Sequence, residues 1–150
     1  MSPSSAERQE GMSPELDSLG ATLAGDALNL LADGRDLNVL LVVQACNGAV
    51  TSYDVSDDGV EACLMGARET VRSLAADADA HDPKAPVRYA IAYEGAVADD
   101  DGSYHDALML EFGERGYRAY SAYSLVAGRG AHEDFQWSDP APAGEIEPLL

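Results

Sequence analysis

Five side chains that could bind a metal or move a proton lie within one acidic stretch, "VADDDGSYHD" (residues 97–106). They are Asp99, Asp100, Asp101, His105 and Asp106, types that ligate cations and act as general acids or bases. The spacing does not fit a calcium loop, because with Asp99 as first ligand Tyr104 and Leu110 stand where glycine and a bidentate glutamate are needed. His105 and Asp106 are adjacent on a predicted strand, so they would point to opposite faces and could not easily share a metal.

The first half of the stretch has the composition of a turn. Aspartate side chains hydrogen-bond to the backbone of tight turns, and Gly102 can take the position that needs a positive φ. Residues 99–102 are therefore predicted to form a turn without a ligand. Asp106 alone keeps a claim on function, because the expected register places it on an apolar face opposite Tyr123.

Two interpretations of Asp106 remain open. A hydrogen bond from the Tyr123 hydroxyl would satisfy the carboxylate without any chemistry. Alternatively, Asp106, Tyr123, Tyr104 and His105 would line a polar ligand pocket. His105 could also meet His132, Glu133 or Asp134 in a metal site if the C-terminal segment folded back, but no motif with ligand spacing is present. We predict no catalytic residue, no metal and no cofactor.

An antiparallel meander of three strands, about residues 87–98, 103–112 and 117–127, would position these side chains. Upstream, Ser13, Pro14 and Gly34 bracket apolar residues at helical spacing and predict a helix. Asn47-Gly48 predicts a hairpin with a type I′ turn between strands 38–46 and 49–55. The first of these strands is apolar on both faces and belongs in the middle of a sheet, whereas the second suits an edge.

A second helix is predicted within residues 56–83, where Asp58 and Glu61 have the spacing of a capping box. The fold class is therefore α+β: a two-layer, five-stranded antiparallel sheet with both helices on one face, in the order α-β-β-α-β-β-β. This order resembles the roadblock/longin/profilin-like group, whose five-stranded antiparallel sheet places its first strand centrally. The resemblance covers residues 13–127 and implies the fold alone.

Three segments are expected: a disordered leader (1–12), a single α+β domain (13–128) and a Pro-rich acidic C-terminal tail (129–150). Four-residue turns would place Tyr89, Ile91 and Tyr93 on one face with Leu108, Leu110 and Phe112, and Glu111 opposite Arg118. The other face would carry Met109, Tyr120, Ala107 and Ala122. That face is too apolar to be simply solvated, which predicts dimerisation or coverage by the tail.

Charge dominates the composition: 27 acidic residues against nine basic ones give a net charge of −18. Such a surface repels phosphate backbones and anionic lipids, so we expect neither nucleic-acid nor membrane binding. No apolar run approaches the ~20 residues of a membrane span, and no secretory signal is recognisable, which favours the cytoplasm. The acidity indicates either a halophilic-like solubility adaptation or a surface for a basic partner. Cys46 and Cys63 are expected to be buried and reduced.

The chain contains no phosphate-binding loop, GxGxxG or GxSxG motif. The favoured function is a non-enzymatic interaction or regulatory module that self-associates as a homodimer. The alternative is a small enzyme or ligand-binding domain with the polar pocket at the rim of the meander. A third interpretation is an acidic decoy for a basic protein partner.

Overall fold

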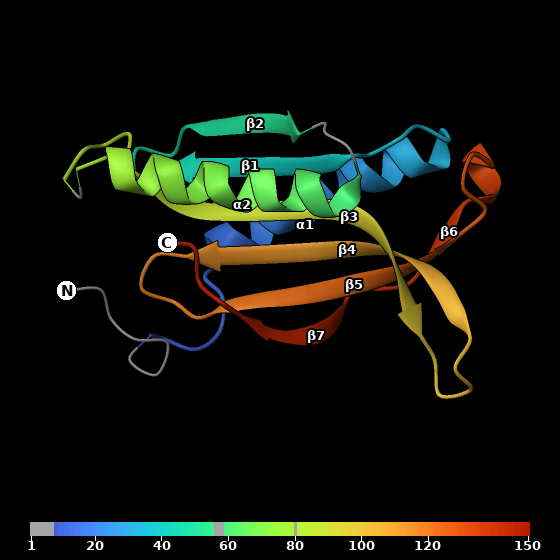
Figure 1. Cartoon of the computed structure of the whole chain (residues 1–150). Helices are drawn as coiled ribbons and strands as arrows, with labels where there is room; N and C mark the ends of the chain where they lie inside the picture. Colours follow the sequence, from blue (N-terminus) through green and yellow to red (C-terminus); the bar gives the residue numbers. More distant parts are fainter. Residues whose placement is uncertain (1–7, 56–58, 80) are drawn as a thin grey trace.

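A computed structural model describes residues 8–55, 59–79 and 81–150, and these form two helices, one short 3-10 turn and seven strands (Figure 1). The elements in chain order are α1 (Pro14–Ala32), β1 (Val39–Ala45), β2 (Val50–Val55), α2 (Val60–Asp77), β3 (Pro86–Ala98), β4 (Tyr104–Glu114), β5 (Ala119–Ala127), η2 (His132–Asp134), β6 (Gln136–Trp137) and β7 (Ala141–Ile146). The strands form one curled antiparallel sheet in the order β2-β1-β3-β4-β5-β6, and β7 also pairs with β5. The α+β class with an antiparallel sheet is confirmed.

The prediction of five strands in two layers is wrong, although the first seven elements follow the predicted order. Two strands come from the segment expected to be a tail. β7 pairs with the outer side of β5 although it contains Pro142, by means of an irregularity between Ser121 and Ala122 that absorbs one residue. The pairing satisfies backbone groups of β5 that would otherwise be unpaired.

The helices also lie on opposite faces of the sheet rather than on one face (Figure 1). β1 explains this arrangement, because alternate residues of a strand point to opposite faces. Val42 packs with α1, whereas Leu41 and Val43 pack with α2. As predicted, β1 is buried on both sides between β2 and β3, and β2 is an edge strand. The protein therefore has two cores, one on each face of the sheet.

The predicted register of the meander is wrong by an odd number of residues at both turns. Asp99 N donates to Ser103 O and closes a shorter loop than expected, so Ile91 pairs with Glu111. An odd slip moves every side chain to the other face. Tyr89, Ile91 and Tyr93 thus share the α2 face with Glu111, while Leu108, Leu110 and Phe112 share the α1 face with Ala90 and Ala92. Glu111 pairs with Ser121 instead of Arg118.

Local signals were more reliable. Ser13 caps α1 by accepting a hydrogen bond from Leu16 N, and Gly34 ends the helix with a φ of 75°. The 46–48 turn forms the predicted hairpin, but only Gly48 has a positive φ, so the turn is not type I′. Asp58, the predicted cap of the second helix, lies outside the described residues, as do residues 1–7 of the predicted leader. Cys63 is buried as expected, whereas Cys46 is exposed in the turn.

Candidate functional site

The acidic stretch around Asp99 is a turn, as predicted. The Asp99 carboxylate accepts hydrogen bonds from the backbone N–H of Asp101 (2.9 Å) and Ser103 (3.0 Å), and Gly102 has a φ of 80°. Its other oxygen lies 2.7 Å from Nε2 of His105. This hydrogen bond is the main cause of a pKa for Asp99 below its usual value. The carboxylate therefore stabilises the β3–β4 hairpin.

The predicted ligand residues do not converge. Tyr104 and Asp106 point to one side of β4 and His105 to the other, because the strand alternates. The predicted Asp106–Tyr123 pair is wrong, since the register places Met109 opposite Tyr123. Tyr104, His105 and Asp106 are exposed, and Tyr123 is half-buried.

The residues of the possible metal site, His105 and His132, also lie apart. His132 lies 3.3 Å from Asp33 at the C-terminal end of α1, so it contacts a different part of the molecule from His105. Across residues 8–55, 59–79 and 81–150, no three His, Cys, Asp or Glu side chains form a group that could hold a metal ion.

The predicted interface residues are divided between the two faces by the register. Ala107 and Ala122 are buried in the fold. Met109 lies on the α2 side, packed over Gly95. Tyr120 lies on the α1 side, where its hydroxyl accepts a hydrogen bond from Gly11 N. These four residues do not form one continuous surface.

The sequence predicted that β2 lies at an edge of the sheet, but this edge was not identified there as a possible binding site. In the β1–β2 hairpin, Ala45 N donates to Ala49 O, which makes this a hydrogen-bonded pair. Because such pairs alternate in an antiparallel ladder, Thr51, Tyr53 and Val55 bond to β1. Val50, Ser52 and Asp54 then turn their N–H and C=O groups outward. Within the described part of the chain, no other strand pairs with β2.

A groove flanks this edge on each face of the sheet. On the α1 face a groove of about 620 Å³ is lined by Pro14, Glu15, Ser18, Leu19, Thr22, Leu23, Asp26, Val42, Gln44, Val50 and Ser52. On the α2 face a groove of about 410 Å³ is lined by Val43, Ala45, Asn47, Ala49, Thr51, Tyr53, Leu74, Asp77, Ala78, Asp82, Lys84 and Pro86. We call them the α1 groove and the α2 groove.

The grooves exist because the helices do not cover the whole sheet. α1 packs mainly on β3 and β4, and α2 mainly on β3 and β1. β2 therefore keeps much of its surface in contact with solvent, and the Val50 side chain is 51% exposed. An apolar residue at that exposure, beside unpaired backbone groups, is a surface suited to another strand.

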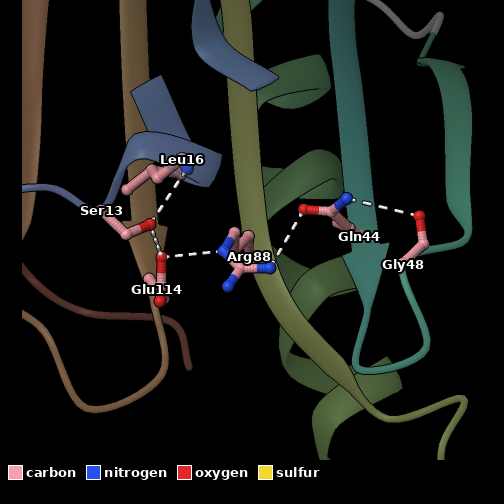
Figure 2. A network of polar contacts seen from close by, with 6 residues as sticks. All are labelled: Ser13, Leu16, Gln44, Gly48, Arg88 and Glu114. Carbon is pink, nitrogen blue, oxygen red and sulfur yellow. Dashed lines mark hydrogen bonds and ion pairs between the residues drawn. The ribbon is translucent and has the colours of Figure 1, made fainter. Parts of the chain in front are cut away.

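A polar network connects the N-terminus of α1 with the sheet (Figure 2). The Ser13 hydroxyl donates to Glu114 Oε1 (2.5 Å), which also accepts from Arg88 Nε (2.9 Å). Arg88 then donates to Gln44 Oε1 (3.1 Å), and Gln44 donates to Gly48 O (3.3 Å). The network joins the start of α1 to β4, β3, β1 and the β1–β2 turn, and its member Gln44 also lines the α1 groove.

A second cluster attaches α2 to the sheet. Arg68 donates to both oxygens of the buried Glu111 (3.1 and 2.5 Å), and the pKa of Arg68 is raised chiefly by this hydrogen bonding. The Tyr93 hydroxyl lies 3.4 Å from the same carboxylate, and burial raises the pKa of Tyr93.

Tyr89 lies beneath this cluster and is fully buried. Among residues 8–55, 59–79 and 81–150 its hydroxyl has no hydrogen-bond partner, although the Leu149 backbone opposes the rise in the pKa of Tyr89. Burial is the main reason that the pKa of Tyr89 is raised. Packing and ion pairing thus hold the buried cluster together, and the cluster attaches α2 to the sheet.

Comparisons with known proteins add no function to this geometry. None of the helices within the described residues is long and apolar enough to cross a membrane. No family model, no curated protein and no solved structure matches the chain.

Proposed function

We propose that the protein is a non-enzymatic interaction module that binds an extended strand along the edge of β2. The observation that carries this proposal is the outward-facing backbone of Val50, Ser52 and Asp54, with a groove on each side of it. Main-chain hydrogen bonds to such an edge supply affinity, and pockets for alternate side chains supply specificity. Both parts are present at β2.

Self-association is the weaker use of the same edge. Two copies pairing β2 with β2 would continue the sheet across a twofold axis. Each copy has a net charge of −18, however, and the edge itself contains Asp54, so repulsion opposes the pairing. The homodimer predicted from the sequence should therefore form only where salt screens these charges. The cytoplasmic location expected from the sequence remains part of this proposal.

The alternative of an enzyme or ligand pocket at the rim of the meander has lost its geometric basis. Its four residues point to both sides of the sheet, and the Asp106–Tyr123 pair on which it depended does not form.

Ser52→Pro tests the proposed edge. The Ser52 N–H points away from β1, so proline removes an outward donor while leaving the β1–β2 ladder in place. We expect wild type to show a concentration-dependent rise above 15.8 kDa in light scattering at 2 M NaCl but not at 50 mM, and Ser52→Pro to remain monomeric in both. Ser52→Ala, which keeps the donor, should behave as wild type.

Amide hydrogen exchange gives a second measurement that does not depend on the variant. In the monomer, the amides of Val50, Ser52 and Asp54 should exchange much faster than those of Thr51 and Tyr53. Assembly should protect the first set. If assembly at high salt leaves these amides unprotected, or if Ser52→Pro assembles as wild type does, self-association does not use the β2 edge.

A further inference from the structure

The acidic groups around β2 are unequally distributed between its two faces. In the α1 groove the charged lining residues are Glu15 and Asp26, both acidic. In the α2 groove Asp77 and Asp82 are accompanied by Lys84, whose amine offsets part of their charge. A strand paired with β2 would point alternate side chains toward α1 and toward α2. The side chains that point toward α1 would therefore contact a more negative surface than those that point toward α2.

We propose that the occupant of the β2 edge is an extended, basic segment of a partner protein, with lysine or arginine at alternate positions facing α1. This inference rests on the proposed function, because it names the partner of that same edge. The other alternate positions, facing the α2 groove, would be uncharged, since the walls there include Tyr53 and Leu74.

The dimensions agree with this arrangement. Glu15 and Asp26 are eleven residues apart, or about 16 Å along the axis of α1. Three cations at alternate positions of a strand span about 13 Å, and flexible lysine stems cover the remainder. Because Glu15 and Asp26 line the same groove as Val50 and Ser52, one face of a six-residue segment paired with β2 would lie beside both carboxylates.

The two acidic residues should not contribute equally. Glu15 lies in the first turn of α1, where the positive end of the helix dipole opposes an incoming cation. Asp26 lies three turns further along, beyond the range of that effect. We therefore expect Asp26→Asn to weaken binding more than Glu15→Gln does.

A second copy of this chain fits the same edge less well. Its β2 strand has the sequence "VTSYDV", which contains one acidic and no basic residue. A copy would bring Asp54 and its own acidic grooves toward Glu15 and Asp26. Charge complementarity therefore favours a basic partner over self-pairing.

The experiment uses four blocked six-residue peptides and the full chain, with binding followed by NMR. Alternating Lys-Val should bind most tightly, alternating Ser-Val more weakly, and alternating Glu-Val at least about tenfold more weakly than Lys-Val at 50 mM salt. The permuted peptide Lys-Lys-Lys-Val-Val-Val has the same charge without the alternation. It should bind more weakly than alternating Lys-Val and should not protect the Ser52 amide.

A matched pair of variants locates the charge effect. The double variant Glu15→Gln/Asp26→Asn should bind alternating Lys-Val about 3- to 10-fold more weakly and alternating Ser-Val as wild type does. Glu133→Gln/Asp139→Asn makes the same change in net charge near β6, away from β2, and should have little effect on either peptide. Thermal unfolding of both variants checks that they fold.

Two failures are distinguishable. If alternating Ser-Val or the permuted basic peptide binds as tightly as alternating Lys-Val, or if both double variants weaken binding equally, the basic-segment inference is overturned while strand addition at β2 can stand. If no peptide protects the amides of Val50, Ser52 and Asp54, and Ser52→Pro changes nothing, the proposed function itself fails.

Discussion

The two sides of the sheet end in different ways. On one side, β2 is a regular six-residue strand without proline, glycine, lysine or an irregularity in its pairing. On the other side, β6 has two residues, and β7 contains Pro142, Gly144 with a φ of 140°, and a shift in its register with β5. Proline, short strands and bulges are the usual means by which proteins prevent edge pairing. The fold therefore blocks one edge and leaves the other available.

The largest expected effect follows from breaking the network that supports the open edge. In Glu114→Ala, Ser13 and Arg88 lose their shared acceptor in a largely buried position. We expect a loss of about 3 kcal/mol in the free energy of unfolding, measured in urea. Glu69→Ala, which removes an exposed partner 3.9 Å from Arg72, should cost less than about 0.5 kcal/mol. If Glu114→Ala lost no more stability than Glu69→Ala, the network would not support the fold.

The next largest effect contrasts the two edges directly. Gly144→Val forces a β-branched residue into a backbone conformation that such residues avoid, which should cost about 2 kcal/mol. Ser52→Val, on the regular edge, should change stability by no more than about 0.5 kcal/mol. Urea unfolding of both variants measures the contrast. If Gly144→Val left the stability unchanged and Ser52→Val lowered it, β2 rather than β7 would be the edge at which pairing is blocked.

Tyr89 lies under the middle of the sheet, so a change there should affect both edges together. Tyr89→Phe removes a buried hydroxyl for which the described part of the chain supplies no hydrogen-bond partner, and it should stabilise the fold by about 1 kcal/mol at pH 7. Because the folded-state pKa of Tyr89 is raised, its neutral form contributes stability that is present below about pH 10 and is lost as the pH rises further.

The advantage of Tyr89→Phe over wild type should therefore grow between pH 9 and pH 11. Urea unfolding at several pH values, with hydrogen exchange at both edges, is the measurement. A variant that is less stable than wild type at pH 7 would mean that the hydroxyl has a partner that stabilises the fold, for which the Leu149 backbone is the candidate.

The smallest effect concerns the Asp99–His105 contact, far from either edge. The pKa of Asp99 is lowered mainly by His105, so the contact is present above the usual aspartate pKa and is lost as the pH falls through the depressed value. His105→Gln should raise the pKa of Asp99, measured by NMR titration, and leave the thermal midpoint unchanged. A large fall in that midpoint would show that this exposed hairpin tip supports the rest of the sheet.

What could be predicted from the sequence was local. Ser13, Pro14 and Gly34 are signals that act within one turn of a helix, and they identified α1 correctly. The two apolar faces of β1 correctly predicted its central place and the edge position of β2. The turn at residues 99–102 was also correct, because aspartate and glycine have local reasons to be there.

Register and long-range pairing could not be predicted in the same way. The length of the loop after Asp99 depends on which backbone groups it closes, and a difference of one residue reversed the faces of β4. The three prolines after Trp137 indicated a tail outside the domain, yet β7 pairs with β5 through a shifted register that no local sequence pattern predicts. The grooves beside β2 depend on which helix covers which face, so they followed only from the assembled structure.

The place of β1 in the sheet has a consequence for synthesis of the chain. β1 pairs with β3, and the contact between Gln44 and Arg88 joins residues 44 positions apart. The hairpin ends at Val55, so at typical rates of translation it is complete about 2 to 7 s before Arg88 is made. During this interval the apolar strand β1 has no partner on the side that pairs with β3 in the folded protein. The excess of acidic residues in the part of the chain made by then would keep neighbouring nascent chains apart until β3 is made.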